Sequence, residues 1–353
     1  MVRQVDLRID VTDAAGLGVA AHVSASVVLP DPQDLPERPM VCFARPAGAY
    51  SRGYYTCDLP GPARGAQAGW HAARGWIFVA MDNLGCGDSS AHETDLLDFA
   101  ELCAAAHAAE QDVLLRLANG VLAEGYPPVN QPTVIGLGQS MGGSLTIWQQ
   151  ARHRGYDGIG VLGFSAVHSH PATPPGESPI VVGWYPRGRG REGVAEPINA
   201  AALAAAAGHA PHDAAWKSLA WGFHYDDVPA EVVEQDLRHY EAIAQRTGLP
   251  AGTEPAPWNS YTTPGRAAQS TLTPGVVATE AAAVTVPVLS AMGVRDLVPD
   301  PHGETRAFRS ARSVDLFVCP RMGHMHNFAG TRELFWQRIH LFGEWCAAVK
   351  ATG

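Results

Sequence analysis

The 353-residue chain has few charged residues, no basic excess and no long apolar run, and each shortage excludes a class of protein. Charged residues make up 17% of the sequence, and the 35 acidic residues outnumber the 25 basic ones. Because nothing offsets the net charge of −10, the sequence argues against a nucleic-acid partner. No run approaches the ~18 apolar residues of a membrane span, and the first six residues lack the apolar region of a signal peptide. We therefore expect a cytoplasmic protein without membrane contact.

Cysteine is also scarce, and its pattern favours a core role over a chemical one. The six cysteines lie at positions 42, 57, 86, 103, 319 and 346. None forms a Cys-x-x-Cys pair or a Cys/His spacing typical of a metal site, and the pair His324 and His326 has no further ligands nearby. Hydrophobic residues supply 46% of the chain, which is ample for a packed core. We expect reduced, buried cysteines, no metal and no cofactor.

Short apolar runs alternate with helical segments over much of the chain. Two strand-like runs, around 5–9 and 20–29, come first, and continuous apolar runs then predict buried strands at 40–44, 76–81, 133–137, 158–164, 286–292 and 314–319. A capping-box pattern at Ser90–Glu93 predicts a long helix after it, and helices are also expected at 141–153, near 301–311 and at the C-terminus. The C-terminal helix is expected to bury residues 334, 335, 339, 342, 345 and 349. This order predicts an α/β fold, with a mostly parallel sheet covered by helices on both faces.

The alternation stops between residues 171 and 285, which we interpret as a mainly helical cap inserted into a core of 1–170 and 286–353. Its first part is rich in proline and carries an Arg/Gly run at 187–191, interpreted as a solvated loop, and helices are predicted near 199–207 and over 213–247. Its aromatic residues belong first to its own core. The candidates for lining an apolar substrate pocket are Tyr50, Trp184, Trp221 and Phe223.

One short turn has the form of a nucleophile elbow. An apolar run at 133–137 precedes Gly138-Gln139-Ser140-Met141-Gly142, and a helical segment follows. In a Gly-x-Ser-x-Gly elbow the serine occupies a strained backbone conformation between strand and helix, so side chains two residues away on either side would collide with it. The alternative is a glycine-rich turn that only packs tightly. The strand before it and the helix after it favour Ser140 as a nucleophile.

Two further groups follow strand ends and complete a set of three. A serine hydroxyl needs a base near neutral pH, and imidazole supplies one when a carboxylate fixes its tautomer. Asp296 follows the predicted strand at 286–292, and His324 follows the one at 314–319. Asp300 is a weaker rival for the acid because it lies further from the strand end, and His326 is a rival for the base. Parallel strands meet at one sheet edge, so we expect Ser140, Asp296 and His324 to converge there.

These residues resemble those of the α/β-hydrolase fold family, over 1–170 and 286–353. The matches are the elbow at 138–142, an Asp-x-x-Gly-x-Gly-x-Ser loop at 82–89, an acid loop at 293–299 and a Gly-His loop at 323–324, in the order serine, acid, histidine. The resemblance implies an oxyanion hole formed by the N–H of Met141 and a second N–H from the loop after the third strand. That loop departs from the family's His-Gly pattern, so the choice between Gly48 and Ala49 stays open.

The resemblance implies a serine hydrolase that cleaves a carboxylic ester or lactone through an acyl-enzyme. The large, aromatic-rich insertion predicts an apolar small-molecule substrate with a bulky acid or alcohol part. A thioesterase, an amidase or a carbon–carbon bond hydrolase would use the same three residues. A non-catalytic ligand-binding module on the same scaffold is the alternative of a different class, because a fold does not fix a function. His326 is interpreted as a substrate contact or as a residue packed beneath the loop. The sequence leaves open whether the chain forms a homo-oligomer.

Overall fold

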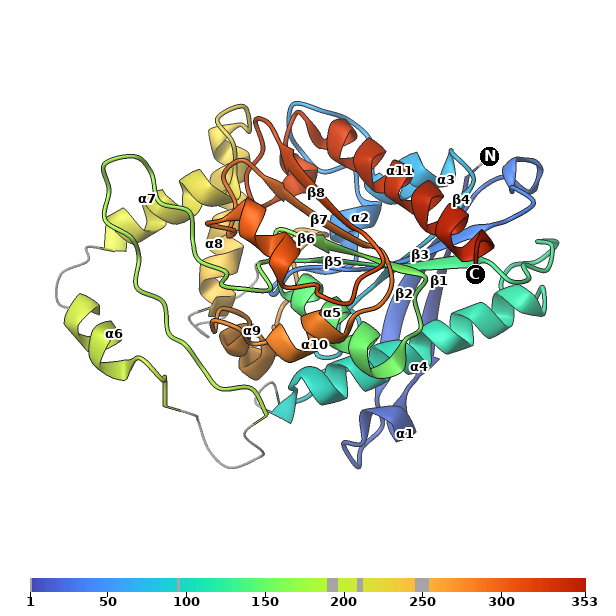
Figure 1. Cartoon of the computed structure of the whole chain (residues 1–353), viewed down its shortest axis with the longest axis horizontal. Coiled ribbons are helices and arrows are strands. Elements are labelled where there is room, and N and C mark those ends of the chain that lie inside the picture. Colours follow the sequence, from blue (N-terminus) through green and yellow to red (C-terminus); the bar gives the residue numbers. More distant parts are fainter. Residues whose placement is uncertain (1, 94–95, 189–195, 208–211, 245–253) are drawn as a thin grey trace.

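In the computed structural model, residues 2–93, 96–188, 196–207, 212–244 and 254–353 are described. Eight strands form a single sheet in the order β1-β2-β4-β3-β5-β6-β7-β8 (Figure 1). The strands are β1 (Arg3–Asp10), β2 (His22–Leu29), β3 (Met40–Arg45), β4 (Trp76–Met81), β5 (Thr133–Gln139), β6 (Gly158–Leu162), β7 (Val288–Gly293) and β8 (Val314–Cys319). Only the pairs β1–β2 and β2–β4 are antiparallel, and the other five pairs are parallel. The mostly parallel sheet predicted from the sequence is therefore present.

Helices cover both faces of this sheet, as Figure 1 shows. On one face lie α4 (Phe99–Ala118) and α5 (Met141–His153), and on the other lie α3 (Gln67–Ala72) and α11 (Arg332–Ala351). Shorter helical segments are α1 (Thr12–Ala15), α2 (Gly53–Thr56), η1 (Pro32–Asp34), η3 (Pro301–Arg306) and η4 (His326–Phe328). None of the helices in the described part of the chain combines the length and the apolar content that a membrane crossing requires.

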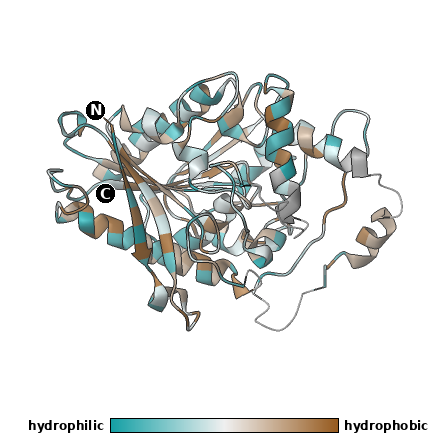
Figure 2. Cartoon of the chain, turned by 180° about the vertical axis from the view of Figure 1, so that it is seen from behind, coloured by the Kyte–Doolittle hydropathy of each residue, from teal (hydrophilic) through white to brown (hydrophobic). Residues whose placement is uncertain are grey.

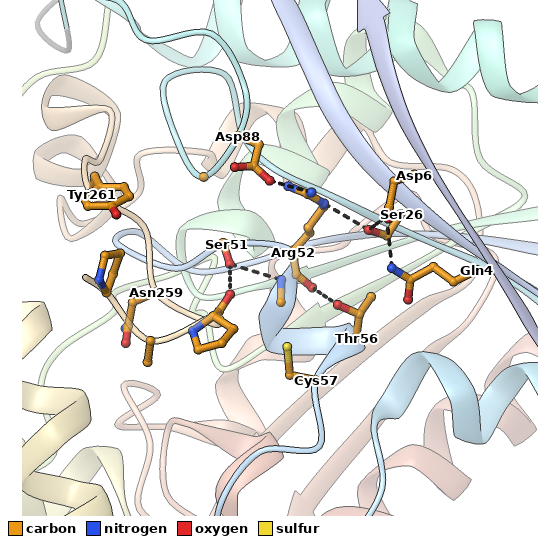
Figure 3. A pocket seen from close by; sticks show the side chains of 15 residues that line it. Gln4, Asp6, Ser26, Ser51, Arg52, Thr56, Cys57, Asp88, Asn259 and Tyr261 are labelled. Atoms are coloured by element: carbon orange, nitrogen blue, oxygen red, sulfur yellow. Dashed lines mark hydrogen bonds and ion pairs between the residues drawn. The ribbon is translucent and has the colours of Figure 1, made fainter. Parts of the chain in front are cut away.

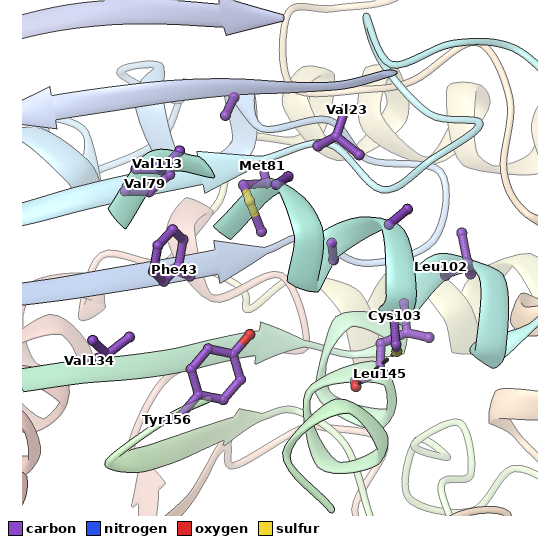
Figure 4. Packing of buried hydrophobic residues seen from close by; sticks show 14 of the residues in the cluster. Val23, Phe43, Val79, Met81, Leu102, Cys103, Val113, Val134, Leu145 and Tyr156 are labelled. Carbon is purple, nitrogen blue, oxygen red and sulfur yellow. Dashed lines mark hydrogen bonds between the residues drawn. The ribbon is translucent and has the colours of Figure 1, made fainter. Parts of the chain in front are cut away.

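The period-two geometry of the strands divides their side chains between two cores. In β3, Val41 and Phe43 face α4 and α5, whereas Met40, Cys42 and Ala44 face α3 and α11. Figure 4 shows the first of these cores, where side chains of the sheet such as Phe43 lie opposite those of the two helices. All six cysteines are free, and all but the half-buried Cys57 are buried, in agreement with the reduced core residues expected.

Between β6 and β7, the described residues form five helices. They are α6 (Ala200–Ala207), α7 (His212–Phe223), α8 (Ala230–Ala244), α9 (Gly265–Thr271) and α10 (Ala278–Ala283). The helical region predicted over about 213–247 contains two of these helices, α7 and α8, separated by a segment with Pro229, and its residues 245–247 lie outside the described residues. α9 and α10 pack against α5, whereas α6 has no buried residue and stands away from the sheet (Figures 1 and 2). Of the Arg/Gly run at 187–191, residues 189–191 lie outside the described residues, and Arg187 pairs with the buried carboxylate of Glu280 at 2.7 Å.

Three expectations about helices are wrong in detail. The capping box belongs to Asp98 and Glu101, which satisfy each other's backbone N–H groups at the start of α4, and Ser90–Glu93 lies before the helix. The helix near 301–311 is only the short η3, which begins with a proline. In α11, Leu334 and Trp345 are about half exposed, because the buried stripe follows Phe335, Ile339, Phe342 and Cys346 at helical spacing.

Candidate active site

Ser140 stands at the junction of β5 and α5 in the conformation that the elbow requires. Its φ of 56° and ψ of −119° lie in a region that L-residues rarely adopt. A Cβ on Gly138 would collide with the backbone of Gly142, and a Cβ on Gly142 would collide with the carbonyl of Arg45. Both glycines are therefore required by close backbone approach. The turn places Ser140, which is half-buried, at the carboxyl end of the sheet.

Asp296 and His324 lie together at the same edge, on the loops after β7 and β8. His324 Nδ1 is 2.7 Å from Asp296 Oδ1, and both side chains are almost completely buried. With Nδ1–H donating to the carboxylate, Nε2 is left as the basic nitrogen of the ring. That atom lies 3.4 Å from the side-chain nitrogen of Gln139, the residue next to Ser140. Asp300, the rival acid, instead caps η3 by accepting from the N–H of Gly303.

Ser140 and His324 line one cavity of about 90 Å³, together with Met141, Ala47 and Gly48. Met141 is the first residue of α5, so its N–H has no partner within the helix and is free to face an anion. Ala47, which the sequence did not single out, lies on the cavity wall beside Gly48. The arrangement brings a serine hydroxyl, an imidazole and the first residue of a helix to one cavity.

The structure separates the two candidates for the second oxyanion donor. Gly48 lines the cavity, whereas Ala49 does not. The N–H of Ala49 donates to the hydroxyl of Thr263 at 3.2 Å, and its carbonyl accepts from the N–H of Ser260. Ala49 is thus used to hold the loop, and the expectation that it could serve as the oxyanion donor is not supported by its contacts.

His326 does not line the cavity but binds the far oxygen of the same carboxylate. Its Nε2 is 2.7 Å from Asp296 Oδ2, and its ring packs against Phe335 with centroids 4.4 Å apart. Burial, only partly offset by Asp296, lowers the pKa of His326, so this ring is neutral near pH 7. Burial opposes ionisation of Asp296, but His324 and the hydrogen bonds from both histidines outweigh it and hold the pKa of that carboxyl well below its usual value. His324 therefore has the geometry of the base, and His326 packs beneath the loop.

Of the four aromatic candidates, two line the cavity. Tyr50 and Phe223 form part of its wall, and the ring of Phe223 lies 5.0 Å from that of His324. Trp221 instead lies under the guanidinium of Arg295, and Trp184 contacts the ring of His168, so neither lines the cavity. Helical spacing in the sequence could not show which of these aromatics line the cavity. Phe223 is the last residue of α7, and there the chain meets the loop after β8 that carries His324 and His326, called the histidine loop below.

Two parts of the site were not foreseen. Gly163 follows β6 with φ of 59°, and a Cβ there would lie 3.0 Å from Asp296 Oδ1 and 3.0 Å from His324 Nδ1. Asp236 of α8 is fully buried and accepts from the hydroxyl of Tyr50 at 2.7 Å and from His224 Nε2 at 2.9 Å. The glycine-rich run at 158–163 was visible in the sequence, but no signal marked Asp236 as a partner of Tyr50, which lies 186 residues away.

A second, larger cleft of about 360 Å³ opens on the other side of the loop that carries Arg52 (Figure 3). Its centre is occupied by Arg52, which pairs with Asp82 and, at 2.7 Å, with Asp88, and which donates to Ser26. None of Ser140, Asp296 and His324 lines it. Within the described residues no three His, Cys, Asp or Glu side chains gather as a metal site.

No protein-family model and no curated protein matches the chain, but solved structures share its fold over nearly the whole length. Proline iminopeptidase from Mycobacterium smegmatis is 16% identical with a TM-score of 0.57, covering 98% of this chain and 100% of that one. The α/β hydrolase GrgF from Penicillium sp. sh18 is 13% identical with a TM-score of 0.54 over 98% and 99% of the two chains. A thermophilic esterase from Thermogutta terrifontis is 12% identical with a TM-score of 0.54 over 96% and 99%. Together with the strand order, these likenesses show that the chain has the α/β-hydrolase fold.

Proposed function

We propose that the protein is a serine hydrolase that cleaves a small carboxylic ester or lactone through an acyl-enzyme. The observation that carries the proposal is that Ser140, on a strained elbow, lines the same cavity as His324, whose other ring nitrogen is bound to a buried carboxylate. A turn that served only for packing would not need a strained serine facing a cavity. The names of the structural neighbours, among them an esterase and a peptidase, are consistent with hydrolysis.

In this mechanism Ser140 Oγ attacks the carbonyl carbon while His324 Nε2 accepts its proton. Asp296 keeps Nδ1 protonated and stabilises the imidazolium that forms. The N–H of Met141, with one from Ala47 or Gly48, stabilises the oxyanion, and each well-placed donor lowers the barrier by about 3 kcal/mol. His324 then protonates the leaving alcohol as the C–O bond breaks. Water attacks the acyl-enzyme with His324 again as base, releasing the acid and restoring Ser140.

The same residues would serve a thioesterase, an amidase or a carbon–carbon bond hydrolase, so the ester assignment needs a substrate test. We expect purified protein to hydrolyse p-nitrophenyl esters or lactones faster than matched acyl-thioesters and anilides. A clear preference for one of the latter would keep the serine mechanism and replace the substrate class.

The first test of the mechanism is Ser140→Ala. We expect turnover to fall by on the order of 10⁴-fold or more with unchanged far-UV circular dichroism, because the acyl-enzyme cannot form. A fluorophosphonate should label the wild type at Ser140 and should not label the variant. Ser178→Ala, at an exposed serine, is the matched control and should retain both activity and labelling. Absence of labelling in the wild type would instead favour a ligand-binding module.

A further inference from the structure

We propose that the cavity beside Ser140 accepts only a short, uncharged acyl group, from acetyl to about butyryl, which makes the substrate a short-chain ester. This inference rests on the proposed function and adds a limit on the substrate. It follows from the volume of the cavity, the chemistry of its wall and the hydrogen bonds that hold that wall in place.

The volume sets the limit. The cavity measures about 90 Å³, which is well below the roughly 150 Å³ of an engineered apolar cavity that binds benzene. The space at Ser140 is therefore too small for a six-membered ring or for a long alkyl chain. It suits an acyl group with a few carbon atoms beyond the reacting carbonyl.

The chemistry of the wall selects for an apolar group. Leu219, Phe223, Leu272 and Leu297 line the cavity, with Tyr240 beside them. Among the described residues that line the cavity, none is an aspartate, glutamate, lysine or arginine that could pair with a charged acyl group. Burying an unpaired carboxylate against this apolar wall would be strongly unfavourable, so we expect a dicarboxylic half-ester to be a poor substrate.

One side of the wall is fixed to the histidine loop. The N–H of His324 donates to the carbonyl of Gly222 at 2.8 Å, and the N–H of Met325 donates to that of Phe223 at 2.8 Å. The ring of Phe223 lies between those of His324 and Tyr240, at 5.0 Å from each. Moving this wall outward to admit a longer chain would break two backbone hydrogen bonds and displace the base.

The other side of the wall is fixed to the loop that carries Gly48. Tyr50 lines the cavity, and its hydroxyl donates to Asp236, a carboxylate that also accepts from His224 and from Trp258 Nε1 at 3.1 Å. The N–H of Ser51 donates to the carbonyl of Trp258 at 2.9 Å. Since both sides are tied to the catalytic loops, the cavity selects by size.

This partly open cavity is assigned to the acyl part for a mechanistic reason. The alcohol must receive a proton from His324 and leave before water attacks, so it needs a route to solvent. The acyl group stays bound to Ser140 through both steps and can remain in the cavity. The length of the acyl chain should therefore affect kcat/KM strongly, and the length of the alcohol should affect it weakly.

The test compares p-nitrophenyl acetate, butyrate, hexanoate and octanoate, and separately acetate esters of alcohols of increasing length. We expect kcat/KM to fall at least tenfold between butyrate and octanoate, because a single ill-fitting methylene already costs about tenfold. Leu219→Ala should enlarge the cavity and raise the octanoate-to-acetate ratio about tenfold. Leu114→Ala, a half-buried leucine on α4 away from the cavity, should leave the ratio unchanged.

Three outcomes would overturn the inference. They are a preference for octanoate in the wild type, a profile that is flat in acyl length but steep in alcohol length, and a Leu219→Ala ratio equal to that of Leu114→Ala. In each case fluorophosphonate labelling of Ser140 would still support the serine hydrolase. Absence of both labelling and turnover would overturn the proposed function itself.

Discussion

At the scale of single residues, one carboxylate organises the histidine loop. Asp296 accepts from both histidines and also from the N–H groups of Gly293 and Leu297, at 2.8 and 2.7 Å. Each oxygen thus accepts two donors, which explains how a fully buried carboxylate stays ionised. Because His326 occupies Oδ2, His324 is directed to Oδ1, and its ring orientation is fixed. The hydrogen bond to Oδ1 uses Nδ1 of His324 and leaves Nε2 as the basic nitrogen of the ring.

Gly163 offers a residue-scale test of this packing. In Gly163→Ala the added Cβ would lie 3.0 Å from both members of the Asp296–His324 hydrogen bond. We expect kcat to fall by about 10- to 100-fold, since a displacement of about 1 Å in a catalytic group has effects of that order. Steady-state kinetics on a p-nitrophenyl ester would measure the change.

Gly16→Ala is the matched control for that variant. Gly16 has a similar φ, 64° against 59°, but a Cβ there would have no neighbour within 4 Å. Both variants should lose about 1 kcal/mol of stability through backbone strain, and only Gly163→Ala should lose activity. Equal kinetics in the two variants would show that space beside His324 is not limiting.

The sequence predicted Ser140, Asp296 and His324 at one sheet edge, because each follows a recognisable strand and the carboxyl ends of parallel strands meet. It could not predict the contacts that select among candidates. Distance from the strand end favoured Asp296 over Asp300, but only the structure shows that Asp296 contacts His324 and that Asp300 caps η3. Ala49 and Gly48 are neighbours, and they are distinguished by the cavity that Gly48 lines and by the contacts of Ala49 with Thr263 and Ser260. Such choices depend on residues far away in the chain, which local patterns do not encode.

At the scale of elements, strands were predicted more reliably than helix faces. Continuous apolar runs marked β3 to β7 because both faces of those strands are buried. In α11, an apolar residue one position off the buried stripe, such as Leu334, looks the same in the sequence as one on it. Which apolar residues of α11 are buried depends on where this helix packs against the sheet. That packing is a tertiary contact, which the local sequence does not encode.

The packing of α3 against the sheet and α11 contains a buried group without hydrogen-bond partners, His71. Its ring stacks on Trp76 with centroids 4.6 Å apart and lies near Phe78 and His340. Neither ring nitrogen has a hydrogen-bond partner. Burial, reinforced by His340 and Arg74, holds the pKa of His71 well below its usual value. The folded protein therefore keeps this histidine neutral.

This depressed pKa predicts a loss of stability in acid. Below about pH 6.5 the unfolded chain binds a proton at residue 71 and the folded chain does not. The free energy of unfolding therefore decreases as the pH is lowered, by up to about 1.4 kcal/mol per pH unit. In His71→Phe this contribution is absent, and the aromatic stack is kept. Urea unfolding at pH 7 and pH 5 should show that the free energy of unfolding decreases less in the variant than in the wild type as the pH is lowered. A constant difference between the two proteins would contradict this account.

At the scale of the whole molecule, the insertion between β6 and β7 contacts both loops of the proposed active site. Its residues 222–223 bind the histidine loop, and its residues 258–263 bind the loop at 47–52. The sequence predicted an inserted segment over the site from the break in the strand–helix alternation, and we keep its description as a cap, with boundaries at 171 and 285, as a proposal. Its contacts suggest a fixed wall of the site rather than a lid that opens.

The hydrogen bonds that Asp236 accepts from Tyr50, His224 and Trp258 allow a test of whether the insertion holds the loop that carries Gly48. Asp236→Asn keeps the shape of the side chain but replaces an acceptor by a donor that faces Tyr50, His224 or Trp258. An unsatisfied buried group costs about 1–3 kcal/mol, enough to raise local opening about tenfold or more. We expect faster hydrogen–deuterium exchange at 47–52 as well as in α8, together with lower kcat, because α8 and the loop that carries Gly48 share this carboxylate.

Asp226→Asn separates that effect from a general weakening of the insertion. Asp226 pairs with Arg295 at 2.7 Å, but its side chain is 70% exposed, so solvent screens the pair and its loss costs about 1 kcal/mol at most. Exchange at 47–52 should stay at the wild-type rate in this control. Faster exchange only in α8, with unchanged kcat, would show that the loop that carries Gly48 is held independently of the insertion. The argument for a short acyl group would then rest only on the contacts of the cavity wall with the histidine loop.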